Sequence, residues 1–146
     1  MKISDFLSPA NVTVGAVLSD KQELLEEMAR KAASAVNMPP DRILSELLKR
    51  ETLGSTGVGG GVALPHARFP EIDKPLGILF RLKKPIVFDA VDEKPVDTAF
   101  LLLLPEASDP LGALAGIARK LRDKAVMAAL RRARDSAEVY RILTAD

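Results

Sequence analysis

The sequence predicts an α/β fold: a layered single domain in which a mixed central sheet is flanked by helices. Apolar residues recur with helical spacing near both ends of the chain, whereas short aliphatic segments bounded by Pro, Gly or Asp fill the middle. One of these segments, residues 96–104, is apolar on both faces, as expected of a central strand that helices cover on each side. Helices, then strands, then helices are typical of a sheet packed between helical layers.

Two helices are expected in the first third of the chain. The first covers about residues 21–36, where Asp20 followed by Glu23 resembles a capping box. Its apolar face is formed by Leu24, Met28, Ala32 and Val36. The segment Pro39-Pro40-Asp41 opens the second helix, which ends near Arg50-Glu51. Its apolar stripe consists of Ile43, Leu44, Leu47 and Leu48.

The middle of the chain is expected to form strands and the remainder to form helices. The expected strands are residues 62–64, 76–82, 86–88 and 96–104. Helical spacing then returns in two stripes, residues 111–121 and 126–130. A terminal helix is expected from about Asp135, because Glu138 follows three residues later and apolar residues with helical spacing come next.

Composition excludes several classes of protein. The chain of 146 residues is 47% hydrophobic, so one domain, residues 1–146, with a substantial core is expected. A net charge of +1 favours neither nucleic acid nor an anionic membrane as a partner. The chain has no cysteine, which excludes disulfides, zinc–thiolate sites and thiol nucleophiles. The start has no apolar signal region, and the aliphatic run at residues 99–104 is too short to span a bilayer, so we expect a soluble, cytoplasmic protein without membrane insertion.

The most informative feature is a glycine cluster followed at once by the only histidine. Five of the nine glycines lie within residues 54–61, and Val62-Ala63-Leu64-Pro65-His66 follows. A glycine-rich loop can direct several backbone N–H groups at one anion. A neutral imidazole is a nucleophile that can carry a phosphoryl group. The pattern therefore predicts phosphoryl chemistry on His66.

The same residues also have simpler interpretations. The loop lacks the Lys-Ser or Lys-Thr that ends a P-loop, and it runs from a helix into a strand, unlike a dinucleotide-binding fingerprint. A glycine cluster can be a flexible connection, and a lone histidine can be structural. Their proximity, with Pro65 stiffening the backbone before His66, favours the functional interpretation.

At this point two segments resemble a known family. Residues 50–66, RETLGSTGVGGGVALPH, resemble the signature of the fructose/mannitol-type IIA domain of the bacterial phosphotransferase system. Residues 85–96, PIVFDAVDEKPV, resemble a stretch characteristic of its nitrogen-regulatory subfamily (PtsN, EIIA-Ntr). The likeness extends over nearly the whole chain and implies the type-2 PTS IIA fold.

The resemblance implies a role for individual residues. His66 accepts a phosphoryl group on Nε2 from a histidine-phosphorylated HPr-like carrier, and no cofactor is expected. Arg50 stabilises the phosphate, because its planar guanidinium suits phosphate oxygens; the alternative is a solvated charge at a helix end. The phosphate-binding loop consists of Ser55, Thr56, Gly57 and Gly59.

The chain departs from the family at a second active-site histidine. Relatives usually carry it at the start of the helix after the Leu-Pro turn, where this chain reads Ser108-Asp109-Pro110-Leu111-Gly112, with Pro110 at about the matching position. Ala67 stands where glycine is commoner. Three hypotheses follow. The first is a regulatory phosphocarrier that reports its phosphorylation state to target proteins. The second is a fructose- or mannitol-type component that passes phosphate to a IIB partner, and the third is a degenerate module that acts by binding alone.

Two charged clusters are interpreted as surface features. Asp89, Asp92 and Glu93 favour a turn and a partner surface over a metal site, because no second histidine or cysteine joins them. From Leu111 onward the chain has eight basic and four acidic residues. They are spread over successive helices without interleaved aromatic residues, which favours solvated helix faces over a nucleic-acid groove.

Overall fold

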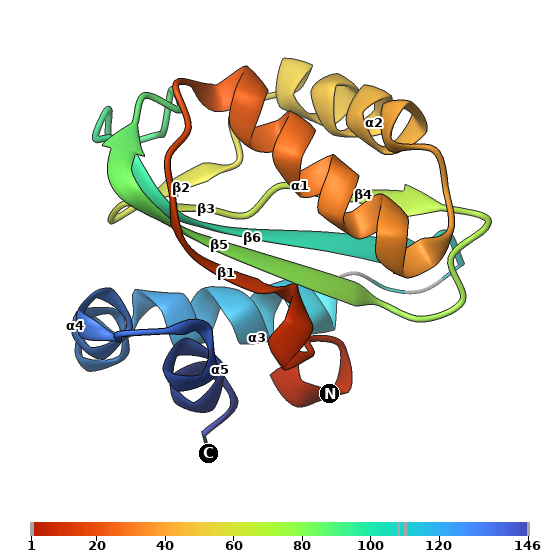
Figure 1. The fold of residues 1–146 in the computed structure, drawn as a ribbon. Coiled ribbons are helices and arrows are strands. Elements are labelled where there is room, and N and C mark those ends of the chain that lie inside the picture. The colour runs from red at the N-terminus through yellow and green to blue at the C-terminus, as the bar shows by residue number, and fades with distance from the viewer. Residues whose placement is uncertain (1, 108, 110, 146) are drawn as a thin grey trace.

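A mixed sheet lies between two layers of helices in the computed structural model, which describes residues 2–107, 109 and 111–145 (Figure 1). The helices on one face are α1 (Lys21–Val36) and α2 (Pro40–Thr52). Those on the other face are α3 (Leu111–Arg122), α4 (Lys124–Arg132) and α5 (Ser136–Thr144). Two short 3₁₀ turns, Ile3–Asp5 and Pro9–Asn11, precede the first strand. The predicted α/β fold with a mixed central sheet flanked by helices is confirmed.

The strands of the described chain are β1 (Val12–Ala16), β2 (Gly57–Gly59), β3 (Val62–Ala63), β4 (His66–Phe69), β5 (Leu76–Ile86) and β6 (Val96–Pro105). They lie in the order β1-β5-β6-β3-β2, with β4 also paired to β6. β1 is parallel to β5, and both β3 and β4 are parallel to β6, whereas the β5–β6 and β2–β3 pairs are antiparallel.

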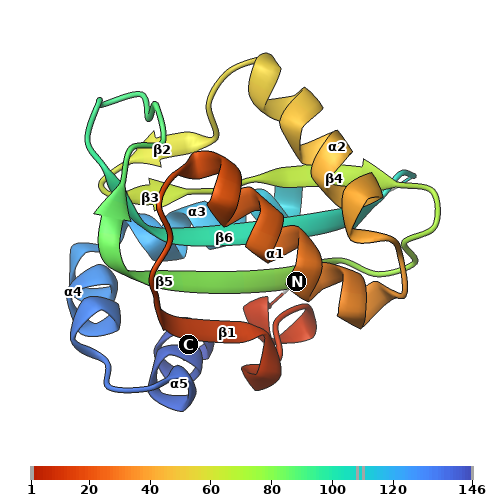
Figure 2. The same ribbon diagram turned by 45° about the horizontal axis from the view of Figure 1, so that its top comes forward.

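The strand segments β3 and β4, which both pair with β6, are separated by an interruption just before His66. β3 and β4 follow one another along the same side of β6, with Ala63 opposite Ala99 and His66 opposite Leu102 (Figure 2). The residues between them, Leu64-Pro65, belong to neither strand. His66 is therefore the first residue of β4, which pairs only with β6 in the described structure.

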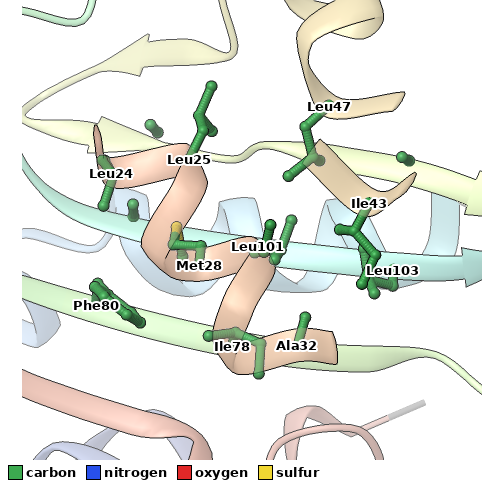
Figure 3. Packing of buried hydrophobic residues seen from close by; sticks show 14 of the residues in the cluster. Leu24, Leu25, Met28, Ala32, Ile43, Leu47, Ile78, Phe80, Leu101 and Leu103 are labelled. Atoms are coloured by element: carbon green, nitrogen blue, oxygen red, sulfur yellow. The ribbon is translucent and has the colours of Figure 1, made fainter. Parts of the chain in front are cut away.

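The central strand β6 supplies apolar side chains to both helical layers. Side chains alternate along a strand, so its aliphatic run fills two cores, and the expectation for residues 96–104 is confirmed. Residues 99, 101 and 103 pack toward α1 and α2, and residues 100, 102 and 104 pack toward α3, α4 and α5. Figure 3 shows the first core, which includes Leu24, Leu25, Met28, Ala32, Ile43, Leu47, Ile78, Phe80, Leu101 and Leu103.

Aspartate caps fix the starts of the first and the last helix, as the sequence analysis expected. The side chain of Asp20 accepts a hydrogen bond from the N–H of Glu23 at 2.9 Å, and that of Asp135 accepts one from the N–H of Glu138 at 2.9 Å. Both expected helix starts are confirmed. The second helix begins at Pro40 and ends at Thr52, and the two later apolar stripes lie in α3 and α4.

The strand expected at residues 86–88 is wrong. Ile86 ends β5, a single strand that begins at Leu76 and passes through Pro85, and residues 87–90 lie outside the sheet. The register between β5 and β6 shifts between Arg81 and Ile86, where Pro85 has no N–H to donate to the ladder. The sequence analysis also did not predict β1, β2 and β4.

Candidate functional site

His66 faces the α3 side of the sheet. Its neighbour Ala67 is buried in the core beneath α1 and α2, and successive side chains in a strand point to opposite faces. The half-buried His66 side chain lines a cavity of about 360 Å³. The other residues that line this cavity are Arg50, Ser55, Thr56, Val58, Leu64, Leu111, Leu114, Ala115 and Ala118.

The backbone fixes the protonation pattern of the imidazole. Nδ1 of His66 lies 2.9 Å from the carbonyl oxygen of Leu64. A carbonyl oxygen can only accept, so Nδ1 donates the proton of this hydrogen bond. In the neutral ring, Nε2 then carries the lone pair. Leu64 is able to offer this carbonyl because it lies in the interruption between β3 and β4.

Arg50 and His66, which the sequence analysis proposed as partners, line the same cavity. Arg50 lies in the last turn of α2, and its side chain is half-buried. Its Nη1 donates a hydrogen bond to the carbonyl oxygen of Gly54 at 2.8 Å, which uses one of the five N–H donors of the guanidinium group. The cation therefore lies at the start of the glycine loop and lines the cavity that His66 also lines.

The loop residues Ser55 and Thr56 also line the cavity, but several of their donors have partners inside the protein. The hydroxyl of Ser55 donates to the carbonyl oxygen of Phe88 at 3.0 Å and accepts from the N–H of Gly57 at 3.0 Å. Both the N–H and the hydroxyl of Thr56 donate to the carboxylate of Glu51. These internal bonds hold the loop in one shape.

Gly57 and Gly59 lie in β2 and are not among the described residues that line the cavity. A Cβ at Gly57 would lie 2.7 Å from the Cβ of Ala90, so only glycine allows this close approach. Gly59 has a φ of 102°, a conformation that favours glycine. The phosphate-binding role expected of these two glycines stays a prediction.

The acidic cluster of Asp89, Asp92 and Glu93 forms a turn that contacts the hairpin of β2 and β3. The carboxylate of Asp92 accepts hydrogen bonds from the N–H of Gly60 at 3.0 Å and from the N–H of Lys94 at 3.1 Å. These bonds, the one from Gly60 foremost, hold the pKa of Asp92 below its ordinary value. Asp89 and Glu93 both adopt positive φ, which is consistent with a tight turn.

Acidification is expected to weaken the contact between Asp92 and Gly60. A carboxyl group whose pKa is lowered in the folded state stabilises the fold above its unfolded pKa. That contribution is lost as the pH falls through the folded-state pKa. We expect the amide signal of Gly60 to shift with pH at the pKa of Asp92 in a ¹H–¹⁵N NMR titration. Asp92→Asn should remove this shift; an unchanged titration in the variant would contradict the assignment.

A buried acid that the sequence analysis did not single out lies beside the site. Glu51 follows Arg50 in α2, and its side chain is only 7% exposed. It forms an ion pair with Lys21 at 2.7 Å in addition to its hydrogen bonds from Thr56. A signal was present, because an acidic residue in the last turn of a helix is disfavoured by the helix dipole and so indicates a specific partner.

Pro110, which matches the second active-site position in sequence, lies outside the described residues. Of the helices in the described part of the chain, none is long and apolar enough to cross a membrane.

Comparisons with known proteins give a consistent result. The family model for the phosphoenolpyruvate-dependent sugar phosphotransferase system, EIIA 2, matches residues 5–146. A nitrogen regulatory protein of Bradyrhizobium diazoefficiens is 41% identical over 145 residues, which cover 98% of this chain and 95% of that protein. A nitrogen regulatory protein of Escherichia coli is 38% identical over 127 residues, 85% of this chain and 78% of that protein.

Two solved structures resemble this chain over nearly its whole length. The nitrogen regulatory protein IIA-Ntr from Neisseria meningitidis has a TM-score of 0.93 and 33% identity, over 97% of this chain and 99% of that chain. The IIA mannitol protein from Escherichia coli has a TM-score of 0.80 at 16% identity, over 93% of this chain and 97% of that chain. The second likeness shows a shared fold.

Proposed function

Because this chain belongs to the EIIA type 2 family of the phosphoenolpyruvate-dependent sugar phosphotransferase system, among its nitrogen regulatory proteins, we propose that it is a phosphocarrier that accepts a phosphoryl group on His66. The observation that carries the proposal is the bond from Nδ1 of His66 to the Leu64 carbonyl, since it leaves Nε2 as the nucleophile. The cavity that His66 shares with Arg50 supports the same assignment.

The transfer is a displacement at phosphorus. The lone pair of Nε2 forms a bond to the phosphorus of a phosphohistidine on an HPr-like carrier, whose other ring nitrogen is protonated. The bond between phosphorus and the carrier nitrogen breaks, and its electron pair stays on the carrier imidazole, which leaves as a neutral ring. His66 keeps its Nδ1 proton, so the phosphorylated ring is positively charged and donates to the Leu64 carbonyl. Arg50 neutralises charge on the phosphoryl oxygens, which is the main requirement of such a transfer.

The surface around the site supports a regulatory role. Three exposed apolar side chains, Leu53, Val58 and Leu111, lie at the end of α2, in β2 and at the start of α3. Val58 and Leu111 also line the cavity. A phosphoryl group on His66 adds negative charge beside this apolar surface, which changes the partners that it can bind. We propose that regulatory target proteins distinguish the two states in this way.

A donor and acceptor assay tests the proposal against sugar transport. The protein is incubated with phosphoenolpyruvate and a donor system that ends in either the nitrogen-related or the sugar-related HPr-like carrier. We expect phosphorylation by the nitrogen-related carrier to be faster and the phosphoryl group to remain on the protein when a fructose-type IIB domain is added. Rapid transfer to the IIB domain would favour the transport component instead.

The proline at the position of the second histidine motivates a separate test. Pro110 offers neither a side-chain donor nor a backbone N–H to a phosphate oxygen. Pro110→His is expected to raise the rate of phosphorylation or the lifetime of phosphorylated His66, measured by mass spectrometry over time. If the natural chain takes no phosphate and Pro110→His restores it, the chain acts as a degenerate binding module.

A further inference from the structure

The buried acid beside the site has no part in the transfer described above. Glu51 is not among the described residues that line the cavity of Arg50 and His66, since consecutive helical residues are rotated by about 100°. Its carboxylate is satisfied by Lys21 Nζ at 2.7 Å, by the N–H of Thr56 at 3.1 Å and by the Thr56 hydroxyl. A buried carboxylate with this many strong donors holds its partners in a fixed position.

Thr56, which Glu51 holds, is the next residue in a series of hydrogen bonds that leads to His66. Thr56 is only 2% exposed, and its carbonyl oxygen accepts a hydrogen bond from the N–H of Leu64 at 2.9 Å. This bond extends the β2–β3 hairpin by one pair beyond Gly57 and Ala63. It therefore orients Leu64 at the point where β3 has ended.

Leu64 completes the connection. Its carbonyl oxygen accepts the hydrogen bond from Nδ1 of His66 at 2.9 Å. The next residue, Pro65, has no N–H to donate. Its carbonyl oxygen accepts a hydrogen bond from the N–H of Leu102 at 3.0 Å, which ties the backbone after Leu64 to β6. The orientation of the Leu64 carbonyl thus depends on two bonds, one of which leads back to Thr56 and Glu51.

Lys21 ties this connection to the first helix. It is the first residue of α1, its side chain is 22% exposed, and it balances the charge of Glu51. Its Nζ also lies 4.5 Å from the centre of the Phe88 ring. The carbonyl of Phe88 in turn accepts from the hydroxyl of Ser55, so α1 supports the loop at two points.

We propose that Glu51, paired with Lys21, is a positioning residue that fixes the imidazole of His66 in its Nδ1–H tautomer through Thr56 and Leu64. The positioning of the ring does not depend on the proposed function. Only its effect on phosphorylation rests on that function, because the tautomer decides whether the lone pair of Nε2 can attack phosphorus. Loss of the carboxylate frees Thr56, loosens the Leu64 carbonyl and allows the ring to carry its proton on Nε2.

The test reads the tautomer directly. His66 is the only histidine, so a long-range ¹H–¹⁵N NMR spectrum of the ¹⁵N-labelled protein contains one imidazole. The wild type is expected to show a protonated Nδ1 and an unprotonated Nε2 at a pH where the ring is neutral. Glu51→Gln is expected to convert a substantial fraction to the Nε2–H tautomer and to slow phosphorylation about tenfold, the effect of one charged hydrogen bond.

Three further variants isolate the effect. Glu46→Gln is the matched control, because Glu46 lies on the same helix and pairs only with Lys49, at 3.2 Å, in the described structure. It is expected to keep the wild-type tautomer. Thr56→Val removes the hydroxyl but keeps the N–H, so it is expected to shift the tautomer less than Glu51→Gln. Thr56→Ser keeps a hydroxyl and is expected to show the wild-type tautomer. The Thr56 pair also decides the question if Glu51→Gln does not fold.

The possible results separate the inference from the proposed function. Wild-type imidazole signals in folded Glu51→Gln, or in folded Thr56→Val if Glu51→Gln does not fold, would overturn the positioning role, even if phosphorylation became slower. A tautomer shift in a protein whose wild type accepts no phosphoryl group would support the positioning of the ring and contradict the phosphocarrier.

Discussion

His66→Ala is expected to abolish phosphorylation completely. The chain has one histidine and no cysteine, so no other imidazole or thiolate can carry the group. Incubation of the wild type with phosphoenolpyruvate and a competent HPr-like donor system should give an adduct that is stable in base and labile in acid. The variant should give none, and mass spectrometry of the intact protein measures both.

The side chain of His66 is only half-buried, so the variant is expected to fold. Circular dichroism and a ¹H–¹⁵N spectrum check this before the assay. His66→Gln provides a second replacement of similar reach that also cannot accept a phosphoryl group. A stable adduct in either folded variant would place the acceptor elsewhere and contradict the account.

Arg50→Ala is expected to slow phosphorylation of His66 by about ten- to a hundredfold. The loss of one charge-assisted hydrogen bond costs about 1.5–3 kcal/mol, and 1.36 kcal/mol corresponds to a factor of ten. Arg50→Lys keeps the charge but not the planar fork, so an intermediate rate is expected. The initial rates of phosphorylation of the wild type, Arg50→Ala and Arg50→Lys are measured in a rapid-quench assay.

Arg50 also donates to the carbonyl of Gly54, so a slower rate could come from a displaced loop. The control is Lys49→Ala, because Lys49 precedes Arg50 and its ion pair with Glu46 lies on the surface. It is expected to leave the rate unchanged. An unchanged rate in folded Arg50→Ala would assign Arg50 to the alternative of a solvated charge at a helix end.

The helices could be predicted from sequence because their signals are local. Asp20 and Asp135 accept the N–H bonds that a cap requires, and Pro40 opens α2. Each apolar stripe recurs within one helix, so no knowledge of distant contacts is needed. The run at residues 96–104 was equally informative, because an uninterrupted aliphatic strand needs cover on both faces.

The short strands could not be predicted because their existence depends on distant partners. β4 has four residues and forms only by pairing with β6, and β1 forms only by pairing with β5. The sequence gives neither partner. The sequence analysis expected one strand over residues 62–64, so it missed the interruption after Ala63 that frees the Leu64 carbonyl for His66.

The candidate site was predictable in part for the same reason. Arg50 and His66 belong to one continuous motif, and the structure brings them to one cavity. The role of Glu51 depends on Lys21, which is far away in sequence. The packing of α1 near the glycine loop brings Lys21 into contact with Glu51. No local pattern links these two residues. Only the fold shows that Thr56, expected to bind phosphate, directs its N–H and hydroxyl to Glu51.

The central claim is that Nε2 of His66 accepts a phosphoryl group. The most direct measurement is the ¹⁵N NMR spectrum of the wild-type imidazole before and after incubation with phosphoenolpyruvate and the nitrogen-related donor system, with a related IIA protein as positive control. The account predicts one phosphoryl group, bound to Nε2, with Nδ1 still protonated. A phosphoryl group on Nδ1 or on another residue, or none when the positive control is phosphorylated, would contradict it.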